Sequence, residues 1–243
     1  MTYCVGLKLT SGLMFLSDTR TNAGVDNISR FRKQFTWSVP GERALVLMTA
    51  GNLATTQAVV SLLEERTKAP SERRPSILEL PTMFQIARHV GETLREVIQS
   101  NAMSGQWADS SFNSTLILGG QVKGMEPRLF MIYPEGNFIE ASDDTPFFQI
   151  GETKYGRPIL VRAYDPDMAI EDAAKLLLVS FDSTIKANLS VGLPLDMQVI
   201  VKDTLRLGPS KRIEAEDPYF RTISNGWGDA LKKAFDSLPP FTF

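Results

Sequence analysis

The sequence MTYCVGLKLTSGLMFLSDTR occupies residues 1–20 and contains two apolar runs, residues 3–9 and residues 13–18. The turn Thr10-Ser11-Gly12 separates the two runs. Apolar runs on either side of a short glycine-containing turn are typical of a β-hairpin. The hairpin starts one residue after Thr2, so removal of Met1 would place a threonine at the amino terminus of its first strand.

A threonine at the amino terminus carries a hydroxyl and a free α-amine on adjacent carbons. The amine, with a pKa of ~8, can accept the hydroxyl proton directly or through a water molecule. Thr2 is therefore a candidate nucleophile that brings its own general base. Cys4 is interpreted as a small buried hydrophobic residue, and His89 as a structural residue of a helix.

The rest of the chain alternates between groups of strands and pairs of helices. A buried strand over 44–50 ends at Gly51-Asn52 and leads directly into a helix over 53–66. A polar connection over 68–78 precedes a second amphipathic helix over 82–100. In the second half, the apolar runs predict strands over 114–121, 127–133, 137–141, 147–151 and 195–202. We also expect a short helix within 153–163 and an amphipathic C-terminal tail. A long helix is expected after Asp165-Pro166-Asp167, because aspartates suit the N-terminus of a helix.

Two strand groups, each followed by helices that are only partly apolar, predict an α+β fold. We expect a single domain over 1–243, built as a four-layer α-β-β-α sandwich of two antiparallel sheets between helix layers. A doubly wound sheet is the alternative, although the meander-type turns between the strands favour antiparallel pairing. The apolar faces of helices 53–66 and 82–100 either pack on a sheet or form contacts between subunits.

Composition excludes several classes of function. The chain has 243 residues, 26 Lys plus Arg and 28 Asp plus Glu, and a formal net charge of −2, which gives no electrostatic argument for binding nucleic acid or a membrane. The sequence shows no secretory signal and no stretch of ~18 apolar residues, so we expect a cytoplasmic protein. The single cysteine excludes an intrachain disulfide and a multi-cysteine metal cluster, and the single histidine excludes catalysis built on several histidines. We expect no cofactor and no metal.

Four separately placed motifs resemble proteasome-type β subunits, and together they cover nearly the whole chain. The segment 18–24 (Asp-Thr-Arg-Thr-Asn-Ala-Gly) resembles the signature that follows the family's terminal threonine, and Arg32-Lys33 falls where the family keeps its active-site lysine if one residue is skipped. Segments 49–54 and 127–151 resemble the family's glycine turn and second hairpin. Segment 188–194 is most similar to Anbu, a bacterial branch of this family.

This resemblance implies an N-terminal nucleophile hydrolase that cleaves peptide bonds and assembles as a homo-oligomer, in a ring or spiral of many subunits. It implies that Thr2 attacks the carbonyl, that Lys33 lowers the pKa of the α-amine, and that Asp18 holds Lys33. It also implies that the backbone N–H of Gly51 stabilises the oxyanion and that Ser190 supports the α-amine. The pocket for the substrate side chain would be lined by Thr21, Thr49 and Leu53, which suit small or apolar side chains.

Each of these residues also has a structural interpretation. Asp18 suits a turn, Lys33 suits a solvated basic stretch, and Gly51 suits the end of a strand. The sequence also departs from the family, because Glu152 stands where a serine is usual and Ala187 where an aspartate is usual. Asn188 and Asp182 are candidate replacements for that acid.

Three functions therefore stay open. They are a threonine endopeptidase acting on peptides or unfolded proteins, an amidase acting on a small molecule, and a non-catalytic assembly protein. The need for an ATP-dependent unfoldase is open as well.

Overall fold

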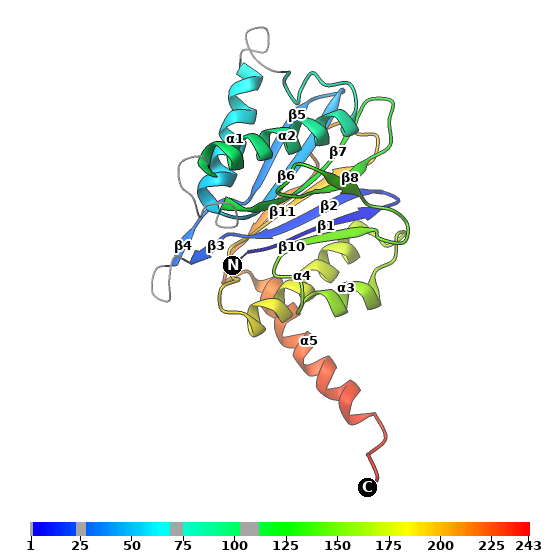
Figure 1. The fold of residues 1–243 in the computed structure, drawn as a ribbon. Helices are drawn as coiled ribbons and strands as arrows, with labels where there is room; N and C mark the ends of the chain where they lie inside the picture. Colours follow the sequence, from blue (N-terminus) through cyan, green and yellow to red (C-terminus); the bar gives the residue numbers. More distant parts are fainter. Residues whose placement is uncertain (1, 23–27, 69–74, 103–111) are drawn as a thin grey trace.

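The computed structural model describes residues 2–22, 28–68, 75–102 and 112–243. Two five-stranded antiparallel sheets form its centre (Figure 1). The first sheet has the strand order β10 (Phe147–Gly151), β1 (Tyr3–Leu9), β2 (Gly12–Asp18), β11 (Leu195–Val201) and β12 (Ser210–Ile213). The second has the order β5 (Gln34–Val39), β6 (Arg43–Gly51), β7 (Ser114–Val122), β8 (Arg128–Ile132) and β9 (Phe138–Glu140).

Helices cover the outer face of each sheet (Figure 1). On the second sheet lie α1 (Leu53–Lys68) and α2 (Met83–Ala102), and on the first lie α3 (Arg157–Ala163) and α4 (Ile170–Ala187). The helix α5 (Pro218–Asp236) packs against α4 and then extends away from the sandwich. The predicted four-layer α-β-β-α sandwich is confirmed, and the antiparallel pairing rules out the doubly wound alternative.

Three apolar clusters hold the layers together. The cluster between the two sheets includes Cys4, Phe15 and Met48. A second cluster joins the first sheet to α4, and a third joins the second sheet to α1 and α2. The third cluster contains Val59 and Leu94, so the apolar stripes of α1 and α2 pack on the sheet.

The start of α4 differs from the sequence prediction. The helix begins at Ile170 after the N-cap residue Ala169, which has no capping side chain. Asp165 Oδ1 accepts a hydrogen bond from the amide of Asp167 at 2.9 Å, and Asp167 Oδ1 accepts one from the Thr10 hydroxyl at 2.7 Å. The two aspartates therefore shape the preceding turn and fasten it to the first hairpin.

Several strands were not predicted. They are β5, β12 and the small antiparallel pair of β3 (Arg20–Asn22) and β4 (Ile28–Arg30). Strand β5 does carry a detectable signal, since Phe35, Trp37 and Val39 alternate with other residues. Within the described ranges, none of the helices combines the length and apolar character needed to cross a lipid bilayer.

Candidate active site

One end of the sandwich gathers the ends of strands from both sheets. The register pairs Tyr3 with Gly151 and Asp18 with Leu195, which places Thr2, Gly151 and Asp18 at the same end of the first sheet. Strand β6 of the second sheet ends there with Gly51. A cavity of about 260 Å³ opens at this end and is lined by Thr2, Thr21, Lys33, Thr49, Ala50, Gly51, Leu53, Thr56 and Gly151.

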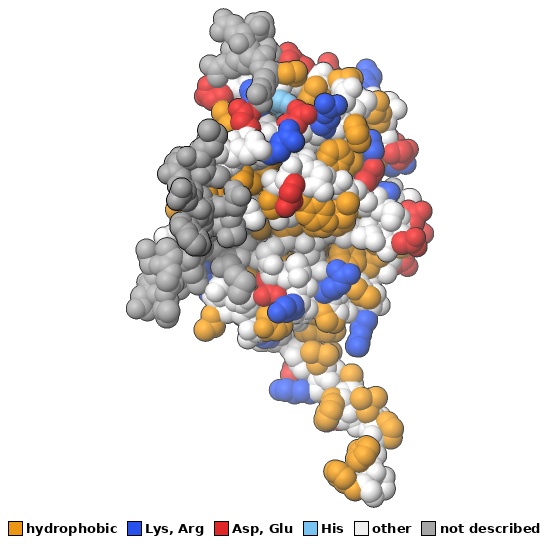
Figure 2. All heavy atoms as spheres, in the orientation of Figure 1, with side chains coloured by type: hydrophobic (Ala, Val, Ile, Leu, Met, Phe, Trp, Pro, Cys, Tyr) orange, Lys and Arg blue, Asp and Glu red, His pale blue; other side chains and the backbone are white. Residues whose placement is uncertain are grey.

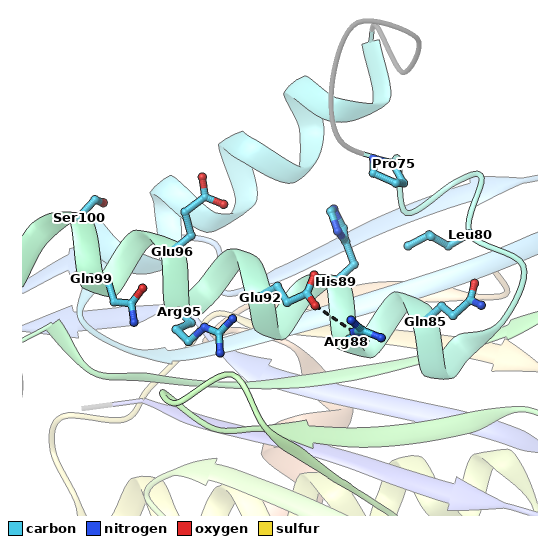
Figure 3. A pocket seen from close by; sticks show the side chains of 10 residues that line it. All are labelled: Pro75, Leu80, Gln85, Arg88, His89, Glu92, Arg95, Glu96, Gln99 and Ser100. Carbon is cyan, nitrogen blue, oxygen red and sulfur yellow. Dashed lines mark hydrogen bonds and ion pairs between the residues drawn. The ribbon is translucent and has the colours of Figure 1, made fainter.

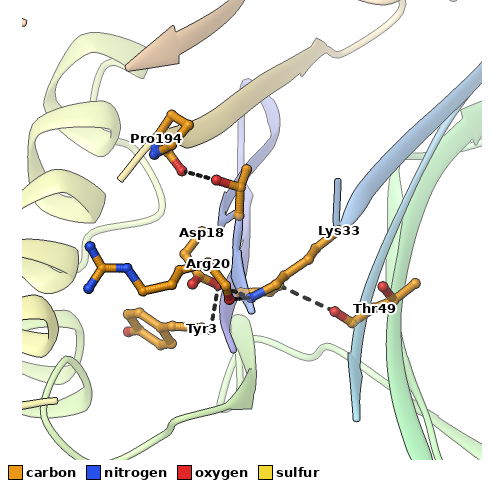
Figure 4. A network of polar contacts seen from close by, with 8 residues as sticks. Tyr3, Asp18, Arg20, Lys33, Thr49 and Pro194 are labelled. Carbon is orange, nitrogen blue, oxygen red and sulfur yellow. Dashed lines mark hydrogen bonds and ion pairs between the residues drawn. The ribbon is translucent and has the colours of Figure 1, made fainter. Parts of the chain in front are cut away.

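Lys33 and Asp18 form a buried ion pair beside this cavity (Figure 4). Lys33 Nζ donates to Asp18 Oδ1 at 2.7 Å and to the backbone carbonyl oxygen of Arg20 at 2.5 Å. The side chains of Lys33 and Asp18 are 5% and 0% exposed. A buried ammonium needs such partners to stay charged at modest cost. The pair therefore holds a fixed positive charge at the cavity wall.

Burial and the groups that donate to Asp18 shift the pKa of its carboxyl in opposite directions, and burial has the larger effect. Burial raises the pKa of the Asp18 carboxyl, while the Lys33 ammonium and the backbone amides of Tyr3 and Gly192 lower it. The Tyr3 amide donates to Asp18 Oδ1 at 2.9 Å, so the carboxylate also fixes the first residue of β1. Asp18 thus links the chain immediately after Thr2 to Lys33.

The basic stretch before β5 divides into two kinds of residue. Arg30 and Arg32 are exposed, whereas Lys33 is buried. The carbonyl oxygen of Lys33 accepts a hydrogen bond from the Thr49 amide at 2.9 Å, which extends the pairing of β5 with β6. This backbone bond fixes where the Lys33 side chain leaves the sheet, so the solvated-face interpretation holds for the arginines and not for the lysine.

Two glycines with positive φ border the cavity. Gly51 has φ +117°, and a Cβ at this position would lie 2.4 Å from the carbonyl oxygen of Asn113. Gly151 has φ +82°, and a Cβ there would lie 2.0 Å from the carbonyl oxygen of Thr2. Both positions require glycine for backbone reasons. A glycine at position 51 therefore does not by itself identify an oxyanion site.

Helix α1 begins directly at the cavity. The side chain of Asn52 accepts a hydrogen bond from the Thr55 amide at 3.0 Å, an N-cap interaction that starts the helix immediately after Gly51. Leu53 and Thr56 both line the cavity from the first turn of this helix. Thr56 was not predicted, although its spacing of three residues from Leu53 places it on the same helix face.

Ser190 lies outside the set of residues that line the cavity. The loop that follows α4 instead reaches Thr2 through Glu152 and Asn188. The Glu152 amide donates to the Thr2 carbonyl oxygen at 2.6 Å, and Glu152 Oε2 accepts from Asn188 Nδ2 at 3.0 Å. Asn188 Oδ1 in turn accepts from the Ser190 amide at 3.0 Å. Asn188 therefore connects the Ser190 amide to Glu152, whose own amide contacts Thr2.

The other two positions considered for the usual acid are Asp182 and Ala187. Asp182 pairs with Lys186 at 3.0 Å, and Ala187 is exposed at the end of α4. Between the two candidate replacements for the usual acid, Asn188 is the one connected to Thr2.

Cys4 and Tyr3 lie beneath the cavity. Cys4 is fully buried between the sheets, and burial raises the pKa of its thiol, which suits a small core residue and not a thiolate nucleophile. The Tyr3 hydroxyl forms hydrogen bonds with Ser180 Oγ and Gln149 Nε2, both at 2.7 Å, and burial raises the pKa of Tyr3 to about 12.

A second cavity, of about 740 Å³, runs along the outer side of α2 (Figure 3). Its lining includes His89, Glu92 and Arg88, and the last two form an ion pair at 2.9 Å. His89 is buried on α2 and points toward Pro75 and Leu80. Six of the eight predicted site residues line the smaller cavity and none of them lines the larger one, so the candidate chemistry is placed at the smaller cavity.

Comparisons with known proteins agree with the fold and with the sequence motifs. The family model described as "Proteasome subunit" matches residues 2–200. Proteasome subunit beta 2 of Pyrobaculum calidifontis is 24% identical over 205 residues, which is 83% of this chain and 90% of that protein. The family model spans the described site, including Ser190.

Solved structures of Anbu proteins are more similar. The Anbu (Gly-1) mutant from Hyphomicrobium sp. strain MC1 is 51% identical with a TM-score of 0.92, and the alignment covers 100% of both chains. Anbu (ancestral beta-subunit) from Yersinia bercovieri is 48% identical with a TM-score of 0.92, covering 99% of this chain and 100% of that one. The structure described as the helical assembly of the Anbu complex from Pseudomonas aeruginosa is 45% identical with a TM-score of 0.91, covering 99% and 98%. The chain therefore belongs to the proteasome subunit family, and within it to the Anbu (ancestral beta-subunit) proteins.

Proposed function

We propose that this protein is a threonine-type peptidase of a self-assembling, proteasome-like particle, and that removal of Met1 activates it. The observation that carries the proposal is the cavity that contains Thr2, Lys33 and Gly51 together, with Lys33 held by Asp18. A hydroxyl, a fixed positive charge and a backbone donor are the groups that acyl transfer requires.

In the proposed reaction, Thr2 Oγ1 attacks the carbonyl carbon of the scissile peptide bond. The free α-amine of Thr2 accepts the hydroxyl proton and returns it to the leaving amine, which leaves an ester on Thr2. Water, deprotonated by the same amine, then hydrolyses the ester. Lys33 would favour the developing alkoxide, and the Gly51 N–H would donate to the oxyanion.

This chemistry depends on processing of the chain. While Met1 is present, the nitrogen of Thr2 belongs to a peptide bond and cannot act as a base. The carbonyl oxygen of Thr2 is already fixed by the Glu152 amide at 2.6 Å. Cleavage of Met1 would therefore create the base while the next backbone group keeps its position.

The cavity also suggests a class of substrate. Its wall toward α1 carries Thr49, Ala50, Leu53 and Thr56, and Thr21 closes another side. These side chains are small or aliphatic, so the pocket suits a small or apolar residue before the cleaved bond. We propose that the substrate is a peptide or an unfolded cytoplasmic protein, and the participation of an ATP-dependent unfoldase stays open.

Self-assembly is part of the proposal because a relative of 45% identity is described as a helical assembly. We propose a homo-oligomer, in a ring or a spiral of subunits, which would restrict access to the cavity in the cytoplasm.

Intact mass and electrophile trapping test the proposal together. We expect the purified protein to lack one methionine and to form a single adduct with an electrophile that bridges the threonine hydroxyl and α-amine. Thr2→Ala should form no adduct and should lose peptide cleavage by at least about 10³-fold. Thr222→Ala, which changes an exposed threonine of α5, serves as the control and should behave like the wild type.

Three results would contradict the proposal. Full retention of Met1 would remove the base. A processed protein that forms no adduct would favour the non-catalytic assembly protein. Adduct formation with turnover of small amides, but not of peptides, would favour the small-molecule amidase.

A further inference from the structure

The last part of the chain is an arm that leaves the sandwich. Helix α5 starts firmly, since Asp217 Oδ1 caps it by accepting from the Phe220 amide at 3.0 Å and the Phe220 side chain is buried. Lys186 Nζ on α4 donates to the Ser224 carbonyl oxygen at 3.3 Å. Beyond this anchor the helix extends into solvent (Figure 1), and every residue from 229 to 243, here called the arm, is exposed.

The arm exposes an apolar stripe and an aromatic end. Leu231 and Phe235 lie four residues apart, which places them on one face of α5, and Leu238 follows two residues after the helix ends. The three residues are 51%, 76% and 65% exposed. Phe241 and Phe243 pack edge to face with ring centroids 5.0 Å apart, and Figure 2 shows the hydrophobic side chains along the whole protruding end.

The helical part of the arm lacks the packing that stabilises most helices. Helices in proteins owe most of their stability to the packing of an apolar face. Contiguous exposed apolar surface on a protein generally marks an interaction site. The stripes of α1 and α2 are covered by their own sheet, whereas the stripe of the arm has no cover within the described part of its own chain.

We propose that the arm packs on a neighbouring copy of this chain. This inference rests on the self-assembly proposed above and adds the segment that makes the contact. The Anbu chain described as a helical assembly aligns with 99% of this chain, so the alignment extends into the arm. An arm that projects beyond its own body can reach a neighbouring subunit that the sandwich alone would not touch.

The size and charge of the arm fit a contact with a second copy of this chain. Three phenylalanines bury roughly 450–750 Å² when covered, close to the ~800 Å² that each partner contributes to a stable interface. The arm carries Asp229, Lys232, Lys233 and Asp236, so its charges cancel. A segment directed to an anionic membrane would instead carry an excess of Lys and Arg.

Substitution of the stripe tests the inference without using peptide cleavage. Leu231→Glu/Phe235→Glu places two negative charges on the stripe and changes the net charge by −2. Lys233→Glu also changes the net charge by −2, but about 200° around the helix from Leu231. It is therefore a control matched in charge and placed on the opposite face.

Light scattering coupled to size exclusion gives the particle mass. We expect the wild type and Lys233→Glu to elute as particles of many 27.0 kDa chains. We expect Leu231→Glu/Phe235→Glu to elute at a several-fold lower mass, with the far-UV circular dichroism of a folded chain. Flotation with vesicles of phosphatidylcholine and phosphatidylglycerol completes the set, and we expect no binding of the wild type.

The possible failures are distinguishable. A wild type that stays monomeric refutes the proposed self-assembly and the inference with it. A large particle that survives Leu231→Glu/Phe235→Glu refutes only the role of the arm. Vesicle binding that is lost in the stripe variant, with an unchanged particle, identifies the partner as a membrane and overturns the inference.

Discussion

Lys33 and Phe235 both lie where residues of their type are rarely found. Lys33 carries a charge inside the sandwich with 5% of its side chain exposed, and Phe235 holds an aromatic ring in solvent with 76% of the residue exposed. The buried lysine is explained within the chain, because Asp18 and the Arg20 carbonyl oxygen accept its hydrogen bonds. The exposed ring has no such explanation among the residues that the structure describes. An unusual placement with internal partners indicates chemistry, and one without them indicates an external partner.

The largest expected effect follows when Lys33 loses its buried ion-pair partner. Asp18→Ala leaves the Lys33 ammonium buried beside one carbonyl acceptor and removes the acceptor of the Tyr3 amide. Removal of one partner of a buried ion pair costs about 3–5 kcal/mol. We expect a loss of this size in the free energy of unfolding, measured by urea denaturation.

The double variant Asp18→Ala/Lys33→Met is the control for this first prediction. If the cost arises from the uncompensated charge, the double variant should recover most of the loss. A double variant as unstable as the single one would show that packing around Asp18, and not the charge of Lys33, determines the effect.

A second, smaller effect concerns the buried hydroxyl next to the site. Burial raises the pKa of Tyr3 from its ordinary value of 10.0 to about 12. The unfolded chain therefore releases this proton first as the pH rises, so Tyr3 destabilises the folded state progressively between pH ~10 and pH ~12. At pH 11 the loss should reach about 1.4 kcal/mol relative to neutral pH.

Tyr3→Phe isolates this contribution. The variant loses the hydrogen bonds to Ser180 and Gln149 at every pH, but it also loses the alkaline titration. The stability difference between wild type and Tyr3→Phe should therefore shrink by about 1.4 kcal/mol between pH 8 and pH 11. Tyr155→Phe, which changes an exposed tyrosine, controls for general alkaline unfolding, and a pH-independent difference for Tyr3→Phe would contradict the prediction.

The site residues that lie next to strand ends were reached from the sequence in two ways. Thr2 was identified from its position after Met1, whereas Asp18 and Gly51 were identified through the resemblance to a family, although each lies at the end of a clear apolar run. The burial of Lys33 could not be read from the stretch 30–33, because that burial depends on the bond between its carbonyl oxygen and Thr49. Only the resemblance to a family selected this lysine.

The remaining features depend on packing between distant segments. Glu152 and Asn188 meet because α3 and α4 return the chain to the end of β10, and no local pattern predicts that contact. The exposed arm was read as an ordinary amphipathic tail for the same reason. Periodicity shows that a helix has an apolar face, but it does not show whether that face is covered.

The third prediction concerns the contribution of the Asn188 hydrogen bonds to stability. Asn188→Ala removes a donor to Glu152 and the acceptor of the Ser190 amide. We expect a loss of about 1 kcal/mol in the free energy of unfolding. Asn137→Ala, at an exposed turn, should change it by less than ~0.5 kcal/mol. Equal effects of the two substitutions would exclude Asn188 from the supporting network.

The smallest effect is expected where the comparison began, at the exposed ring. In the wild-type chain, measured at a dilution at which it is monomeric, we expect deletion of residues 229–243 to change the free energy of unfolding by less than ~0.5 kcal/mol, because every deleted residue is exposed. Phe220→Ala, in the anchored first turn of the same helix, should cost about 3–5 kcal/mol because that ring is buried. A loss above ~1 kcal/mol on deletion would mean that the arm folds back onto its own sandwich. Phe235 would then have an internal partner like that of Lys33, and its exposure would no longer point to a neighbouring subunit.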